Sequence, residues 1–514
     1  MVAEGRQEIT CGGSGRPPKF RVGEREDDCE RISELPDHLL LHILSFLCID
    51  DAIPTSLLCR RWRYLWRSID SLDFPQHCGE RKGNSVEFID RILALHEGLK
   101  IKRFCARIHY NSSYVSHLDS WMNFAVARNV EKLVLDLFAV ENGFPSYVLP
   151  RSVFNCGSLV ELDLNLCHLR LPPSFRLASL KKLAIANTVF IGNALRDLVS
   201  GSPVLEELIL VNCNRARDLD IVVLNQSVKK MKVVEFPDEF EEGTDLKVYA
   251  PHLRHFELQS GEPRPCRIGD LSSIVSASLE IRKTNTCLQY DPNLKNNCVQ
   301  IVSRLLLGLH EVKTLRLSSW CVQNLISCKA SLSPKEMRHY LPTQLQNLEH
   351  LKIELQLLED ELLGIIFLLR NSPKLERLTI HICRRPHIDM AMENGNPCLY
   401  NWTEECLWNC NPSSSYIPSR HLKEIIVENF KGEDNEIKFL EIVLKNSIIS
   451  KKMVIVIPQK SFYGSGESYL ECCRKDGKAS IQYMKNIEKL LTLQRSAYAD
   501  ILFAGSYATS ISSS

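Results

Sequence analysis

The chain of 514 residues is too long for one ordinary hydrophobic core, so we expect two or three structural units. Hydrophobic residues make up 44% of it and charged residues 24%, values that exclude wholesale disorder and a fibrous repeat. Lys+Arg 63 against Asp+Glu 62 leaves a formal net charge of +1, which gives no electrostatic reason to expect nucleic acid or a membrane surface as a partner. The expected partners are therefore proteins.

Targeting and metal-binding signals are weak. Residues 1–10 are polar and mixed in charge, unlike a secretory signal, and no apolar run approaches the roughly 20 residues that span a bilayer. We therefore expect an intracellular protein, in the nucleus or the cytoplasm. The 20 cysteines are scattered, without the paired CxxC units of a zinc site, and are interpreted as small buried hydrophobic residues. No metal or other cofactor is expected.

Glycine, proline and mixed charges dominate residues 1–30, a composition that predicts a disordered tail. The segment that follows, ISELPDHLLLHILSFL, places its apolar residues on one stripe of an amphipathic helix, with Pro36 in the first turn. A second helix is expected after Asp50 and Asp51. It contains TSLLCRRWRYLWRSI and has Pro54 within its first turn.

These two helices form a unit at residues 31–75, which is too small for a comfortably stable core of its own. Its apolar residues either bind a partner or pack on the rest of the chain. The sequence LPDHLLLHILSFL followed by SLLCRRWRYLW resembles the F-box, the motif that binds the Skp-type adaptor of cullin-based ubiquitin ligases. By this resemblance the adaptor-binding surface and its support comprise Leu35, Pro36, Leu39, Leu40, Ile43, Leu44, Leu57, Leu58, Trp62, Leu65 and Trp66.

An L-x-x-L-x-L signature recurs after a connecting segment at residues 76–128. Its copies are VEKLVL at 130, LVELDL at 159, LKKLAI at 180, LEELIL at 205, VKKMKV at 228, LRHFEL at 253, VKTLRL at 312, LEHLKI at 348, LERLTI at 375 and LKEIIV at 422. The early copies have the 20 to 29 residue spacing of leucine-rich repeats. Each copy predicts a strand whose leucines enter a core shared with its neighbours, so residues 129–400 are expected to form a curved solenoid.

Two repeats share the order helix, Gly201 or Asn371, Ser-Pro, strand. We expect Gly201 and Asn371 to close their helices in the left-handed conformation, with Pro203 and Pro373 preventing continuation. The same order in two distant repeats favours an α/β solenoid.

Residues between the core leucines are expected on the concave face of the sheet, because side chains alternate along a strand. That face is polar and of mixed charge, which suits a protein or peptide better than an apolar ligand. The target-binding candidates are Glu161, Asp163, Asn165, His255, Glu257, Arg316, Arg377 and His381, and Lys182, Glu207, Gln259, Lys352 and Thr379 share their pattern.

The C-terminal residues 412–504 read as strand, helix and strand, with Ile437 and Leu440 on the helix and KKMVIVIP as the later strand. This order resembles the FBD domain of plant F-box proteins with leucine-rich repeats, as do a helix near residues 484–493 and a strand at 501–503. A polar insert at 461–480 departs from that pattern, and 505–514 is a second disordered tail. The expected fold is an α/β leucine-rich-repeat solenoid with a small all-α N-terminal F-box and an α/β C-terminal FBD domain.

The resemblance implies a substrate adaptor of a Skp-cullin-F-box ubiquitin ligase, whose F-box binds the Skp-type adaptor and whose repeats bind a target protein. The alternative is a leucine-rich-repeat scaffold or small-molecule sensor without a role in degradation. An enzyme is not expected, because no nucleophile with its base, carboxylate pair or cofactor loop has a recognisable spacing.

Overall fold

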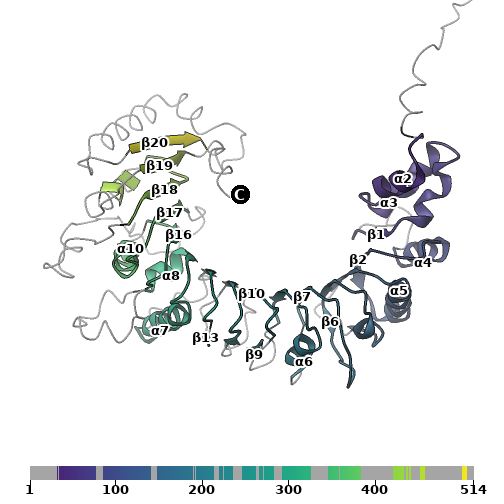
Figure 1. Ribbon diagram of the computed structural model, residues 1–514, viewed down its shortest axis with the longest axis horizontal. Helices are drawn as coiled ribbons and strands as arrows, with labels where there is room; N and C mark the ends of the chain where they lie inside the picture. The colour runs from purple at the N-terminus through teal and green to yellow at the C-terminus, as the bar shows by residue number, and fades with distance from the viewer. Residues whose placement is uncertain are drawn as a thin grey trace, which may run out of the picture.

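A computed structural model gives the structure of the chain. The residues it describes are Ile32, 34–76, 85–139, 147–188, Phe190, 193–213, 219–235, 246–282, 292–325, 345–383, 421–441, 452–457 and 500–505, except 224, 262–265, 270, 358, 433–435 and 438. Figure 1 shows a horseshoe in which short helices occupy the N-terminal end, a long sheet lines the inner side, and helices such as α5, α6 and α7 lie outside it.

The N-terminal unit contains α2 (Asp37–Leu44), α3 (Ile49–Ala52) and the 3-10 helices η1 (Ile53–Leu57) and η2 (Trp62–Ser68). The prediction of the first helix is confirmed, with Pro36 just before its first residue. The prediction of one continuous second helix is wrong, because α3, η1 and η2 take its place. Pro54 stands at the start of η1, where its missing N–H and its ring end the α-helical hydrogen bonding.

This unit packs onto the solenoid as well as onto itself. Leu40, Leu44, Trp62 and Trp66 are buried in one hydrophobic cluster that continues into the first strands. α3 packs against β1 (Ser71–Phe74), which is the edge strand of the long sheet. The F-box helices therefore cover one end of the sheet.

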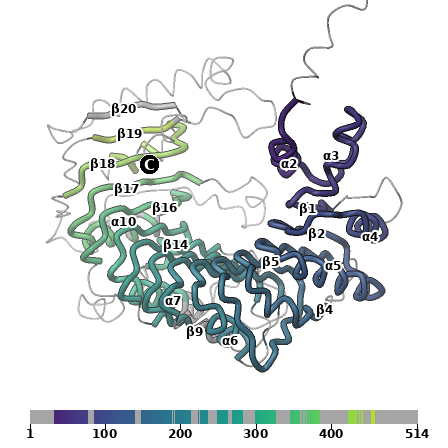
Figure 2. The backbone as a smooth tube through the Cα atoms, turned by 45° about the vertical axis from the view of Figure 1, so that its right-hand side comes forward, coloured from purple at the N-terminus to yellow at the C-terminus, as the bar shows by residue number. Residues whose placement is uncertain are grey.

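Fifteen parallel strands form the long sheet, in an order that follows the chain. After β1 they are β2 (Arg103–Tyr110), β3 (Lys132–Ala139), β5 (Glu161–Asn165), β7 (Lys182–Ala186), β8 (Glu207–Val211), β10 (Lys230–Glu235), β12 (His255–Ser260), β14 (Ser276–Ile281), β15 (Thr314–Leu317), β16 (His350–Leu355), β17 (Arg377–Ile382), β18 (Glu424–Glu428), β19 (Lys452–Ile457) and β20 (Asp500–Gly505). Every L-x-x-L-x-L signature of the sequence lies on one of these strands. Figure 2 shows their regular succession around the arc.

The outer side carries the remaining elements. Two small parallel sheets consist of β4 (Tyr147–Val148) with β6 (Cys167–His168), and β9 (Leu219–Val222) with β11 (Leu246–Tyr249) and β13 (Cys266–Ile268). The helices are α4 (Ser85–Leu95), η4 (Ser112–Tyr114), α5 (Val115–Ala127), η5 (Val153–Asn155), α6 (Ala194–Ser200), α7 (Pro292–Gly308), α8 (Ser319–Gln323) and α10 (Glu359–Asn371). The core lies between the long sheet and this outer layer.

Three strands of the sheet, β1, β2 and β14, have no counterpart in the predictions. The core positions of β2 are occupied by Phe104 and Ala106, and one core position of β14 is occupied by Ala277. These residues are buried like the leucines of the other strands, but they do not produce the leucine signature. The sheet thus begins before residue 129, and β18 to β20 extend it past residue 412. The predicted domain boundaries and a separate FBD domain stay predictions, and the insert 461–480 and the helix near 484–493 lie outside the described residues.

Left-handed backbone occurs at strand ends and not at the two predicted helix ends. The C-cap Gly201 has φ −73°, and Asn371 is not among the positive-φ residues. Gly201 is needed for space instead, since a Cβ there would lie 2.4 Å from the Phe175 ring. Asn187 and Asn212, directly after β7 and β8, do adopt positive φ. Their side-chain amides donate along the solenoid, from Asn212 to Asn187 and from Asn187 to Asn165.

Cysteines support the turns that follow several strands. The thiol of Cys213 contacts the carbonyl oxygen of Ile185 at 3.3 Å, and that of Cys321 lies 3.7 Å from the carbonyl oxygen of Leu279. Burial raises the pKa of Cys213 and Cys321 to about 11, so both thiols stay neutral. The interpretation of these cysteines as buried hydrophobic residues is confirmed.

Candidate binding surfaces

The F-box presents an apolar surface on the side away from the solenoid core. Leu57 is 87% exposed, Leu58 is 64% exposed and Phe46 is 76% exposed, while Leu39 and Ile43 are about 40% exposed. Pro36 is exposed beside them. Large apolar side chains in one small unit cost free energy in water and mark an interaction surface.

The structure divides the predicted adaptor-binding residues into two groups. Leu40, Leu44, Trp62 and Trp66 are buried, so they support the helices and do not form the surface itself. Leu35 and Leu65 are half-buried and pack against the core. The remainder of the predicted set is exposed, namely Pro36, Leu39, Ile43, Leu57 and Leu58.

Phe46 belongs to the exposed surface although the sequence analysis did not select it. It lies three residues after Ile43 and seven after Leu39, a helical spacing in the sequence, although α2 itself ends at Leu44. Its ring also contacts His42, with the ring centroids 4.8 Å apart. The helical spacing was therefore the signal that could have identified it.

Polar contacts hold this unit in place. The Arg61 guanidinium donates to Asp37 Oδ1 through Nε at 2.9 Å and Nη2 at 2.6 Å, which ties the start of η2 to α2. The Arg67 guanidinium lies over the Tyr64 ring, 4.7 Å from its centroid, and also pairs with Glu97 at 3.2 Å. The Arg67 carbonyl accepts from the backbone N–H of Glu97, so η2 is joined to the chain that precedes β2.

The second candidate surface is the concave face of the long sheet, where side chains from successive strands lie in rows. In the row nearest the start of the strands, Lys132 pairs with Glu161 at 2.5 Å and Lys182 pairs with Glu207 at 3.2 Å. Each pair joins neighbouring strands whose residues are in direct register. Such partly exposed pairs contribute little stability individually, about 0–1 kcal/mol, and fix the local arrangement of charge.

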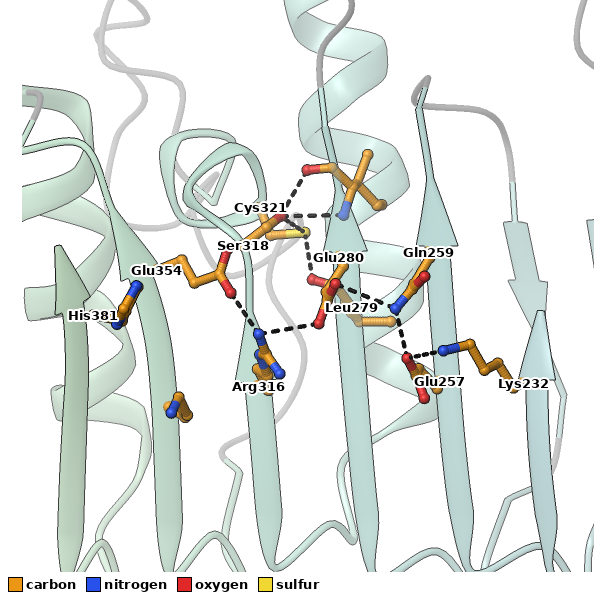
Figure 3. Close-up of polar contacts among 12 residues, drawn as sticks. Lys232, Glu257, Gln259, Leu279, Glu280, Arg316, Ser318, Cys321, Glu354 and His381 are labelled. Carbon is orange, nitrogen blue, oxygen red and sulfur yellow. Dashed lines mark hydrogen bonds and ion pairs between the residues drawn. The ribbon is translucent and has the colours of Figure 1, made fainter. Parts of the chain in front are cut away.

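A longer chain of polar contacts crosses β10 to β16 (Figure 3). Lys232 pairs with Glu257 at 2.8 Å, and Gln259 donates to Glu257 at 2.6 Å and to Glu280 at 3.3 Å. Arg316 continues the chain, at 3.2 Å from Glu280 and 2.6 Å from Glu354. Each of these three carboxylates thus contacts one of the two cations.

The same mutual pairing continues across β16 to β19. Arg377 and Lys452 flank the Glu424 carboxylate at 2.6 and 2.7 Å; burial acts to raise the pKa of Glu424, but hydrogen bonds with these two cations bring it below its usual range. Glu428 accepts from Lys352 at 3.1 Å and contacts His381 at 3.2 Å.

His381 is the histidine most affected by its surroundings on this face. Hydrogen bonds with the side chains of Cys383 and Glu428 raise the pKa of His381 from 6.5 to about 9. It is therefore a cation at neutral pH and a member of the ion-pair network.

The predicted target-binding residues consequently differ in what they can offer a partner. Glu161, Glu257, Arg316, Arg377 and His381 are held in ion pairs. Asn165 donates to Asp136 at 2.7 Å, and His255 shares a hydrogen bond with Ser276 at 2.8 Å. Asp163 differs, because within the described part of the chain its carboxylate has no hydrogen bond or ion pair.

The described residues contain no group of three or more His, Cys, Asp or Glu side chains placed to hold a metal ion. A membrane-crossing helix, long and apolar enough for the purpose, is likewise absent from the part of the chain that the structure describes.

Comparisons with known proteins identify both the N-terminal unit and the repeats. Residues 32–74 match the F-box domain, and residues 92–406, more than half of the chain, match the family described as At1g61320/AtMIF1, LRR domain. The chain belongs to the plant F-box/LRR-repeat family. Members of this family are typically non-catalytic adaptors, and an F-box implies binding to Skp1 in a ubiquitin ligase complex.

Relatives of this F-box/LRR-repeat protein in Arabidopsis thaliana are similar over most of their length. F-box/LRR-repeat protein At3g03360 is 31% identical over 68% of this chain and 70% of its own. F-box/LRR-repeat protein At5g02910 is 28% identical over 85% and 90%, and F-box/FBD/LRR-repeat protein At1g51370 is 27% identical over 84% and 90%. The similarity therefore extends through the F-box and the repeats together.

Proposed function

We propose that this protein is the substrate-recognition subunit of a Skp-cullin-F-box ubiquitin ligase. Its F-box binds a Skp-type adaptor and through it a cullin, while the concave face of the repeats binds a target protein for ubiquitination. The observation that carries the proposal is the exposed apolar surface of Leu39, Ile43, Phe46, Leu57 and Leu58 on an F-box located at one end of the horseshoe.

Separation of the two surfaces supports this function. The F-box surface lies at the N-terminal end of the sheet, and the concave rows extend from β2 to β19 (Figure 1). A chain that holds two partners at once raises the effective concentration of one near the other, which is the contribution a non-catalytic subunit makes to a transfer reaction.

The experiment measures binding of the purified chain to a purified Skp-type adaptor. Replacing both Leu57 and Leu58 by aspartate places charges in the centre of the exposed apolar surface. We expect the dissociation constant to rise at least about 30-fold, because loss of a buried apolar anchor costs about 2 kcal/mol or more. The change should not unfold the F-box, since both side chains are exposed.

Leu99→Asp is the matched control. Leu99 is 93% exposed and lies just before β2, outside the F-box, so its replacement makes the same exposed leucine-to-aspartate change, with one charge instead of two, without touching the proposed surface. Adaptor binding by the Leu57→Asp, Leu58→Asp chain at parental strength would refute the surface assignment. A parental chain that does not bind the adaptor would refute the ligase function and favour the scaffold alternative.

A further inference from the structure

One row of the concave face has apolar side chains on two adjacent strands in the N-terminal half of the sheet. Asp163 on β5, Ala184 on β7, Ile209 on β8 and Lys232 on β10 are direct neighbours in register. All four occupy the strand position that faces away from the buried leucines. The row thus presents an acid, two apolar side chains and a base in spatial order.

The apolar centre of this row is wider than two residues. Ala186 and Val211 lie beside Ala184 and Ile209, one pleat further along β7 and β8, and all four are half-buried. On β12, β15 and β16 the corresponding positions carry Glu257, Arg316 and Lys352, which are held in ion pairs (Figure 3). β7 and β8 therefore offer adjacent apolar side chains between Asp163 and Lys232.

Asp163 marks the acidic end of the row. Burial and the neighbouring Asp136 carboxylate raise the pKa of Asp163, although Lys132, Lys182 and Arg107 act in the opposite direction. No cation among the described residues comes within ion-pair distance of it. A cationic side chain arriving here would find a carboxylate that lacks a direct partner.

Lysines mark the basic end. Lys230 is exposed two residues before Lys232 on β10 and has no ion pair in the described ranges, whereas Lys232 is already paired with Glu257. Arg254, at the start of β12, adds a third positive charge. Besides burial, Lys230 and Arg254 lower the pKa of His255, which shows that their charges reach this part of the face.

We propose that the rows between β5 and β10 bind an extended segment of the target that carries a basic, an aliphatic and an acidic residue in linear order. The basic residue pairs with Asp163, the aliphatic residue packs on Ala184 and Ile209, and the acidic residue pairs with Lys230. This inference rests on the proposed function, in which the concave face is the target-binding surface.

Sheet geometry sets the spacing of this segment. Asp163 and Lys230 are separated by three strand intervals of about 4.8 Å and by two residues of about 3.3 Å along β10, which together give a distance of about 16 Å. An extended chain advances about 3.3 Å per residue, so the basic and acidic residues should be about four to five positions apart with the aliphatic residue between them. Electrostatic complementarity at both ends would then fix the direction of the segment.

A displayed library of random 12-residue peptides, selected on the full chain, tests the inference. We expect roughly tenfold enrichment of peptides in which Lys or Arg and Asp or Glu stand about four to five positions apart around Leu, Ile or Val. Absence of that pattern among the selected peptides, or a pattern with acidic residues at both ends, would overturn the proposal.

Reversing the charge of Asp163 or of Lys230 tests which residue of the peptide each of them binds. Asp163→Lys should change the preferred residue at the basic position to Asp or Glu and leave the other positions unchanged, and Lys230→Glu should do the converse at the acidic position. Ser200→Lys adds a charge at an exposed position of α6, outside the concave face, and serves as the control. If the residue preferences of the selected peptides stay the same in both charge-reversed variants, the peptides bind another surface.

The two proposals fail in distinguishable ways. Selection of peptides does not involve the F-box, and adaptor binding does not involve β5 to β10. A chain that binds the adaptor but selects no such peptide contradicts the segment alone, whereas a chain that selects the peptide but binds no adaptor contradicts the ligase function.

Discussion

Gly364 illustrates how closely the outer helices pack. It lies in α10, and a Cβ at this position would be 2.2 Å from the carbonyl oxygen of Val322 in α8. Alanine favours a helix over glycine by up to about 1 kcal/mol, but backbone atoms cannot move aside as the end of a side chain can. We expect Gly364→Ala to lower the free energy of unfolding by about 1–3 kcal/mol, measured by urea denaturation.

Gly157→Ala is the control for that substitution. No atom lies within 4 Å of a Cβ built on Gly157, so alanine there should be neutral or stabilise the protein by about 0.4–1 kcal/mol through the unfolded chain. Equal stability of the two variants would show that the contact between α10 and α8 tolerates an added methyl group.

Individual residues show where sequence reasoning succeeded and where it could not. Burial of the leucines followed from their period, because a shared core is the only place for them. The exposure of Phe46 was readable from its helical spacing, but the role of Gly201 was not. Its neighbour Phe175 is a contact made by folding, which local sequence does not contain.

At the scale of elements, the strands were predicted from their leucine residues more than from the spacing of apolar residues of any type. β1 and β2 repeat the same spacing of buried residues as the other strands, with Phe74, Phe104 and Ala106 at core positions. The turns after two strands are also held by buried carboxylates, which no sequence motif predicted. Glu361 accepts from the backbone N–H of Gln356, and Glu436 accepts from that of Lys431, each carboxylate five residues after the group it binds and almost fully buried.

The contact between β17 and β18 should make stability depend on pH. The pKa of His381 is about 9 in the folded chain against 6.5 ordinarily. Its contribution to the free energy of unfolding is therefore fully present below pH 6.5 and is lost as pH rises through 9. Because the side chain is partly exposed to solvent, we expect this contribution to be only about 1 kcal/mol. We expect the free energy of unfolding to fall between pH 6.5 and 9.5, and the fall to be smaller in His381→Gln.

A control variant separates this effect from general titration. His310 lies at the C-terminal side of α7 and contacts the Leu307 carbonyl, with its side chain half exposed. His310→Gln also replaces one histidine by glutamine, so the difference between the two variants measures what the His381 contacts add. A profile of His381→Gln that coincides with the parental one would contradict the assigned role of the His381 contacts with Cys383 and Glu428.

The whole molecule has one continuous core, from the F-box helices to β19. Sequence reasoning identified the F-box and the repeats separately and left open whether the F-box packs on the chain or awaits a partner. The structure shows the packing, and it leaves Leu57 and Leu58 exposed. Which concave charges neutralise one another could not be predicted, because the pairs join residues as far apart as Lys352 and Glu428.

This continuity predicts that the F-box is the N-terminal cap of the solenoid. β1 is an edge strand, and its Leu72 and Phe74 are fully buried beneath elements that include α3. Removing residues 1–69 should expose both side chains, at a cost of about 3–6 kcal/mol. Repeat proteins lose stability locally, so β1 and β2 should exchange their amide hydrogens at least about 100-fold faster while β16 and β17 keep their protection. Hydrogen exchange read by mass spectrometry would measure this, with a chain lacking only residues 1–30 as the control. Equal protection of β1 and β2 in the two truncated chains would mean that the F-box docks on the solenoid without capping it.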